Sequence, residues 1–118
     1  MSRELVQVGR VSRIAPGTGC SIIGIDVKDN VFAIGHKLIF RDPNGGQPNI
    51  TIHVATLEVD RSRTNRTERG KEYGVKPYTE PLPVPPPNWL VFVPKAQALA
   101  AEKMQPKNWS RSSHIGAW

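Results

Sequence analysis

The sequence predicts an all-β domain, a six-stranded and mostly antiparallel closed barrel, and three observations support this fold class. Between residues 4 and 59 the apolar residues recur at every second position, which is the spacing of half-buried strands. Segments rich in Gly, Pro, Asn and Asp separate the apolar runs, and these residues favour turns. Two of the runs change parity midway, which is typical of strands with a β-bulge, and bulges help a sheet to curl into a barrel.

Six segments have the strand pattern, and they span residues 5–14, 20–27, 37–41, 49–59, 73–76 and 89–93. The first changes parity at Gly9, where a kink needs no Cβ, and the fourth gains a residue near Ala55 and Thr56. The residues expected to fill the barrel are Val6, Val8, Val11, Ile23, Ile25, Val27, Leu38, Phe40, Ile52, Val54, Leu57, Val59, Val75, Val91 and Val93.

The 118 residues suffice for one domain with one core. We assign residues 1–93 to the barrel, including a proline-rich strap at 77–87, whose six prolines exclude a regular ladder. Pro94 is suited to open a helix, alanines follow it, and Pro106 ends it, so residues 94–106 are predicted to contain a short C-terminal helix. Residues 107–118 are predicted to form a flexible tail.

Positive charge is concentrated in the second half of the chain. The net charge is +6, and residues 1–60 hold six Lys and Arg against six Asp and Glu, whereas residues 61–118 hold ten against four. This asymmetry predicts an acidic partner, of which nucleic acid is the commonest, although a charged surface that only confers solubility is the alternative.

The polar stretch after Asp60 is predicted to be an exposed basic loop. Its cations are spaced two or three residues apart, as contact with successive phosphates requires, and Tyr73 beside them could stack on a base. The predicted nucleic-acid-binding residues are Arg61, Arg63, Arg66, Arg69, Lys71 and Tyr73. A solvated loop or a protein contact is the other interpretation of the same residues.

Three short motifs resemble a known family. They are Val8-Gly9-Arg10-Val11, then Ile34-Gly35-His36-Lys37-Leu38-Ile39-Phe40, and Gly70 followed by Tyr73-Gly74-Val75-Lys76. Together they resemble the β-barrel second domain of translational GTPases such as elongation factor Tu, over about residues 5–93. The resemblance implies a translation-protein barrel that contacts RNA or the ribosome, here as a small stand-alone module. The chain departs from the family at His36, where aspartate is usual, and in an enlarged segment 41–49.

The two glycines of these motifs, Gly35 and Gly70, are expected to have positive φ, because each precedes a strand after a tight turn. No Gly-x-x-x-x-Gly-Lys-Ser/Thr loop occurs in the sequence, so the phosphate cradle of a GTPase is missing. We therefore expect a barrel that does not hydrolyse nucleotides.

The sequence does not predict an enzyme, a metal site or a cofactor. The histidines His36, His53 and His114 lack a metal-ligand spacing from one another and from Cys20, and no nucleophile, base and orienting group form a motif. Cys20 is expected to be buried and structural. One cysteine and no long apolar run indicate a cytoplasmic protein without a membrane partner.

Two functions remain open. The first is a non-catalytic RNA- or ribosome-associated binding module that uses the basic loop on the barrel. The alternative is a protein-interaction or assembly subunit that docks through the proline-rich strap and the tryptophan-bearing tail. The partner-binding residues of that alternative are Trp89, Trp109 and Trp118.

Overall fold

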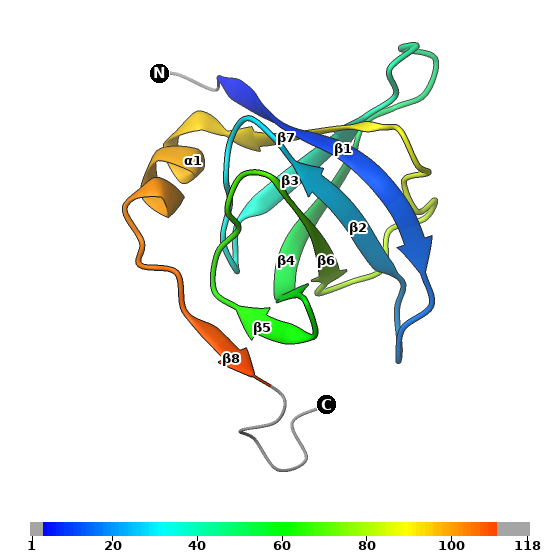
Figure 1. Cartoon of the computed structure of the whole chain (residues 1–118). Coiled ribbons are helices and arrows are strands. Elements are labelled where there is room, and N and C mark those ends of the chain that lie inside the picture. The colour runs from blue at the N-terminus through cyan, green and yellow to red at the C-terminus, as the bar shows by residue number, and fades with distance from the viewer. Residues whose placement is uncertain (1–3, 111–118) are drawn as a thin grey trace.

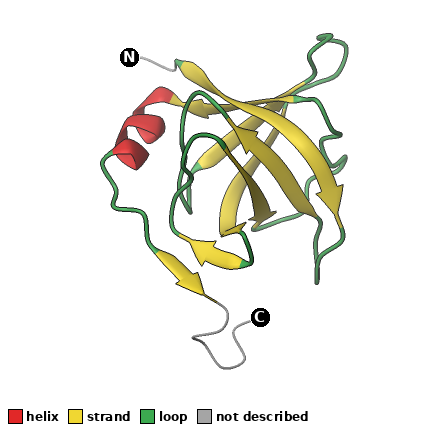
Figure 2. Cartoon of the chain, viewed as in Figure 1, coloured by secondary structure: helices red, strands yellow, loops and turns green. Residues whose placement is uncertain are grey.

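The computed structural model describes residues 4–110 and is a closed β-barrel with one short helix (Figures 1 and 2). Six strands form the barrel: β1 Leu5–Ala15, β2 Ile22–Val27, β3 Lys37–Arg41, β4 Ile50–Val59, β6 Lys71–Pro77 and β7 Leu90–Pro94. Their order is β3-β7-β1-β2-β6-β4, and pairing of β3 with β4 closes the cylinder. Every pair is antiparallel, so the predicted fold class is confirmed.

Two short strands extend the sheet beyond the barrel. β5 Ser62–Thr64 pairs with the last residues of β4, and β8 Asn108–Ser110 pairs with β5. The sequence predicted neither strand, because β5 lies in the polar stretch and β8 in the predicted flexible tail. The rest of that tail, residues 111–118, lies outside the described residues.

The predicted parity changes are present as register shifts. One lies between Gln7 and Gly9 where β1 pairs with β7, and another lies between Val54 and Thr56 where β4 pairs with β6. At Gly9 a Cβ atom would lie 1.8 Å from the carbonyl oxygen of Asp26, so this close approach requires glycine.

The barrel interior holds every predicted core residue except Val6, which is half-buried and packs against the core. Sequence reasoning missed the segment Val31–Ala33, which joins β2 to β3 and is buried although it has no strand pattern. Thr67 fixes it, because the Phe32 N–H donates to Thr67 Oγ1 at 3.0 Å and the Thr67 N–H donates to the Phe32 carbonyl at 2.9 Å.

Both predicted glycine turns are confirmed, with φ of 86° at Gly35 and 88° at Gly70. Next to Gly35, His36 Nδ1 accepts a hydrogen bond from the Ala33 N–H at 3.1 Å, so this imidazole closes the turn. Burial lowers the pKa of His36, which favours the neutral ring that can accept this bond.

The helix α1, Lys95–Glu102, lies beside β1 and β7 at one end of the barrel (Figure 1). It falls within the predicted range 94–106. In the described part of the chain no helix has the length and apolar character needed to cross a membrane.

Candidate nucleic-acid interface

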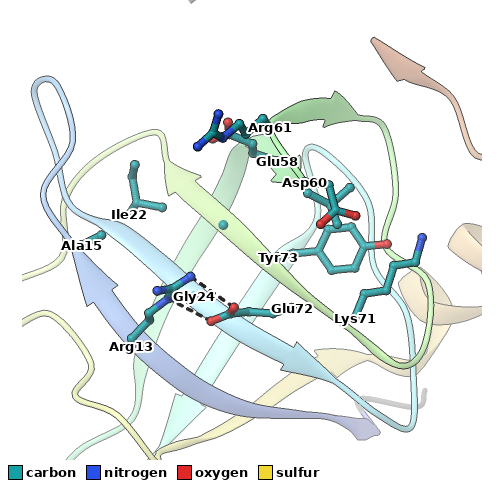
Figure 3. Close-up of a pocket in the computed structure, with 12 residues that line it drawn as sticks. Arg13, Ala15, Ile22, Gly24, Glu58, Asp60, Arg61, Lys71, Glu72 and Tyr73 are labelled. Atoms are coloured by element: carbon teal, nitrogen blue, oxygen red, sulfur yellow. Dashed lines mark hydrogen bonds and ion pairs between the residues drawn. The ribbon is translucent and has the colours of Figure 1, made fainter. Parts of the chain in front are cut away.

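A groove crosses the outer surface of β1, β2, β6 and β4, and Figure 3 shows the residues that line one part of it. It consists of two pockets with volumes of about 590 Å³ and about 490 Å³. Both are lined by Ile22, Glu58 and Gly74, so they adjoin along one wall. The second pocket extends below the β1–β2 loop, where Pro16, Gly17 and Thr18 line it.

Two glycines make the floor of the groove. Gly24 of β2 and Gly74 of β6 face each other in the ladder, Arg13 lies opposite Gly24, and Glu58 lies opposite Gly74. Side chains alternate between the two faces of a strand, so glycines at two facing outward positions leave a depression in the barrel wall. A Cβ atom at Gly74 would lie 3.1 Å from the Ile22 side chain, so that side chain leans over the floor.

The charges that line the groove come from several elements. Arg13, Arg61 and Lys71 line the first pocket, and Arg63 and Lys76 line the second. The carboxylates at the groove are Glu58, Asp60 and Glu72. Five cations against three carboxylates give this surface an excess of positive charge.

One of these carboxylates is already paired. Glu72 accepts two hydrogen bonds from Arg13, at 3.1 and 3.3 Å, and one from Ser12 Oγ at 2.5 Å. Figure 3 shows the Arg13–Glu72 pair beside Gly24. With Glu72 neutralised by Arg13, the other cations outnumber Glu58 and Asp60.

Arg61 owes its position at the groove to a tight hairpin. Asp60 and Arg61 have φ of 50° and 63°, and they form the two-residue turn between β4 and β5. Positive φ at both central positions is the geometry of the turn that best matches the twist of paired strands. The hairpin therefore directs Arg61 and Arg63 to the groove, although neither belongs to the barrel itself.

The structure brings only part of the predicted basic loop together. Arg61, Arg63 and Lys71 are exposed and line the groove. Arg66 and Tyr73 are buried, with 8% and 1% of their surface exposed. Arg69 is exposed, but its guanidinium forms an ion pair with Glu102 and donates to the Asp29 carbonyl at 2.8 Å.

Arg66 has a structural role instead of the predicted surface position. Its guanidinium donates to the backbone carbonyls of Ala101, at 2.9 Å, and Met104, at 3.0 Å, and to its neighbour Thr67 at 2.9 Å. Carbonyls at a helix C-terminus have no partner within the helix, so a guanidinium is a fitting cap. In this arrangement the charge is not presented to a ligand.

Tyr73 is also used inside the molecule. Its ring belongs to the core, and its hydroxyl accepts a hydrogen bond from the Glu68 N–H at 2.8 Å. Burial raises the pKa of Tyr73, because the ionised phenolate is less stable away from water. A buried ring is not available to stack on a base from outside.

The other candidate residues of the sequence are distributed widely. Trp89 is 8% exposed and packs in the core, Trp109 lies in β8, and Trp118 lies outside the described residues. Cys20 is half-buried rather than buried, with its sulfur 4.0 Å from the Pro77 carbonyl oxygen. Residues 4–110 contain no cluster of three or more His, Cys, Asp or Glu that could hold a metal ion.

The predicted binding residues did not include Arg13 or Lys76, although Arg13 on the first strand could be expected to extend the basic face, and sequence reasoning missed the glycine floor. A signal was present, because Gly24 and Gly74 occupy positions of outward parity in two strands. Their proximity depends on the pairing of β2 with β6, two strands far apart in the sequence that only the barrel order brings together.

The fold and the groove define a closed antiparallel β-barrel with a charged, glycine-floored surface groove. No family model, no curated protein and no solved structure matches this chain.

Proposed function

We propose that this chain is a non-catalytic binding module for RNA or a ribonucleoprotein, and that it uses the groove over β1, β2, β6 and β4. The observation that carries the proposal is the convergence of five cations from separate elements on one groove, where they outnumber the carboxylates. Cations held by strands and a tight hairpin lose little conformational freedom when they bind phosphates.

The mixed composition of the groove favours RNA over a simple polyanion. Glu58 and Asp60 can accept hydrogen bonds, and a nucleotide offers donors on its base and its 2′-hydroxyl. At the glycine floor a ligand would meet the side chains of Ser12 and Ile22, which lie over Gly24 and Gly74, together with the backbone of the sheet.

A resemblance in the sequence also supports the proposal. The motifs around Gly9, Gly35 and Gly70 resemble those of the barrel domain of translational GTPases, and we propose that the chain is a member of that class of barrel. We also propose a cytoplasmic location, because its RNA and ribonucleoprotein partners are found there.

The proposal is tested by titrating a labelled single-stranded oligoribonucleotide at several salt concentrations. Arg61→Asn and Lys71→Gln remove one cation each, and Asn tolerates the positive φ of position 61. Each variant should bind more weakly and reduce the slope of log K against log salt by about 0.7, the value for one phosphate contact on a single strand. Lys37→Gln, an exposed lysine on β3 that does not line the groove, is the control and should differ little from the parent. Salt-independent binding would refute the proposal.

A second candidate function is docking on a protein through the strap. Leu82 and Tyr78 are 91% and 69% exposed, although the strap that bears them is anchored at both ends. The Tyr78 N–H donates to the His53 carbonyl at 3.2 Å, and the Asn88 N–H donates to the Val11 carbonyl at 2.8 Å. Large apolar side chains on a fixed segment suit insertion into a pocket of a partner.

Capture from a nuclease-treated lysate separates the two candidates. A protein partner of the strap should be recovered after nuclease treatment and lost from the Leu82→Ser variant. Partners that disappear with nuclease, and that Arg61→Asn also loses, support the groove instead.

A further inference from the structure

The loop after β5 holds the C-terminal segment of the described chain against the barrel. Arg66 donates to the carbonyls of Ala101 and Met104, and Arg69 forms an ion pair with Glu102. Asn65 continues the contact, since its Nδ2 donates to the Gln105 carbonyl at 2.9 Å. Two arginines that the sequence places in a basic loop are therefore engaged by α1 and the segment that follows it.

The segment held in this way has little packing of its own. Of the eight residues of α1 only Ala98 and Ala101 are buried, and Leu99 is 54% exposed. The N-cap residue, Pro94, makes no side-chain capping bond. Helices this short are unstable in isolation, so α1 depends on its tertiary contacts. At its N-terminal end the Lys95 N–H donates to the Glu4 carbonyl and Gln97 Oε1 accepts from the Lys37 N–H, and at its C-terminal end the two arginines hold it.

The backbone that carries the arginines is fixed independently of α1. Thr67 is hydrogen-bonded to Phe32 in the core, Thr64 Oγ1 donates to the Arg66 carbonyl at 3.1 Å, and residue 66 forms a bridge with Ala33. Departure of α1 would thus remove the acceptors that the two side chains have in α1 and after it, while the loop and the bonds from Arg66 to Thr67 and from Arg69 to Asp29 remain. An arginine that loses its carbonyl acceptors keeps its charge and must find other acceptors.

Phosphate oxygens can replace those acceptors, and their hydrogen bonds with guanidinium are charge-assisted. Arg61 and Lys71, which line the groove, flank Arg66 and Arg69 in the chain. While α1 is docked, Arg61 and Lys71 line the groove, and Arg66 and Arg69 are bonded to α1 and the residues after it.

We propose that α1 and RNA compete for Arg66 and Arg69, so that the docked helix is an autoinhibitory contact that lowers the affinity of the module for RNA. This inference rests on the proposed function of the groove. Displacing α1 presents Arg66 and Arg69 together with Arg61, Arg63 and Lys71. Binding of RNA and detachment of α1 are then linked, and each promotes the other.

The experiment uses the full chain and a labelled single-stranded oligouridine. Glu102→Gln removes the ion-pair partner of Arg69, and Ala100→Gly weakens α1 at an exposed position that makes no contact with Arg66. Asp42→Asn is the matched control, because it changes the net charge as Glu102→Gln does, in the β3–β4 hairpin, where the Asn oxygen can still accept from the Asn44 N–H.

Both α1 variants should bind several-fold more tightly than Asp42→Asn, with a salt slope steeper by about 0.7 for each arginine that gains a phosphate contact. In the parent protein, saturating oligouridine should accelerate hydrogen exchange of the α1 amides, which a purely structural role of Arg66 would leave unchanged.

The inference is overturned if the α1 variants bind no more tightly than Asp42→Asn, or if oligouridine binds the parent without changing the hydrogen exchange of the α1 amides. If Arg61→Asn weakens binding while the α1 variants match Asp42→Asn, the groove binds RNA and the competition does not exist. If the parent fails to bind and only the α1 variants bind, the competition is supported in its strongest form. If none of these proteins binds, the proposed function and this inference fall together.

Discussion

The two halves of one basic stretch behave differently, although their sequences are alike. Arg61 lies in the turn between β4 and β5, Arg63 lies in β5, and both line the groove, whereas Arg66 and Arg69 come three and six residues after Arg63 and hold α1. The difference arises from β5, a three-residue strand that turns the chain back along β4 and then delivers Arg66 to the helix C-terminus. The positions of arginines in a sequence therefore do not show which of them can bind a ligand, because the pairing of a strand as short as β5 determines where each side chain lies.

The largest expected effect on stability is that of replacing Arg66. Arg66→Ala removes the guanidinium that donates to the carbonyls of Ala101 and Met104, of which the Ala101 carbonyl keeps the Met104 N–H, and it should lower the free energy of unfolding by about 2 to 4 kcal/mol. Arg61→Asn should change it by less than about 0.5 kcal/mol, because Arg61 is exposed and Asn tolerates its φ. Urea unfolding measures both values. Equal effects would mean that the two halves of the stretch do not differ as described.

A smaller effect is expected at Tyr73. Tyr73→Phe keeps the buried ring but removes the acceptor of the Glu68 N–H, so we expect a loss of about 1 kcal/mol in urea unfolding. The hydroxyl of Tyr78, which is 69% exposed, provides the comparison, and Tyr78→Phe should be nearly neutral. If Tyr73→Phe were also neutral, its hydroxyl would not fix the turn before β6.

The barrel itself could be predicted because its signals are local. Alternating Val and Ile residues, the parity changes at Gly9 and near Ala55, and the turn glycines Gly35 and Gly70 are each readable within a few residues, and each is present. The strand order is not local in this sense, because β7 lies between β3 and β1 and β2 pairs with β6, and the sequence did not predict these neighbours.

The site could be predicted only in part, because it depends on pairs distant in sequence. Gly24 meets Gly74, Arg13 meets Glu72, and Arg66 meets Ala101, and no local pattern in the chain reports these contacts. Tyr73 illustrates the limit, since its inward parity was visible in the strand around Val75 while its place beside the arginines favoured a surface role. For an aromatic residue within a strand, parity is the better guide.

Lowering the pH should reduce the free energy of unfolding, because His36 becomes protonated. Its Nδ1 accepts the Ala33 N–H, and burial holds its pKa below the ordinary value of a histidine, about 6.5. Below that pH the unfolded chain binds a proton that the folded protein resists, so the contribution to stability is present above about pH 6.5 and is lost as the pH falls. Unfolding by urea between neutral and mildly acidic pH measures this loss. In His36→Asn, which can accept the same hydrogen bond without titrating, the dependence on pH should be reduced.

The smallest effect on stability is expected at the groove. Arg13 and Glu72 are 74% and 36% exposed, and exposed ion pairs contribute about 0.2 to 1 kcal/mol at most. Arg13→Gln should therefore lower the free energy of unfolding by an amount near the lower end of that range, as measured by urea unfolding. The same change frees the Glu72 carboxylate from its ion pair within the groove, so it should weaken oligoribonucleotide binding. Glu72→Gln frees Arg13 and should strengthen binding with an equally small change in stability. Opposite shifts in affinity from two variants of equal stability would assign this pair to binding rather than to folding, and equal shifts would contradict its place in the interface.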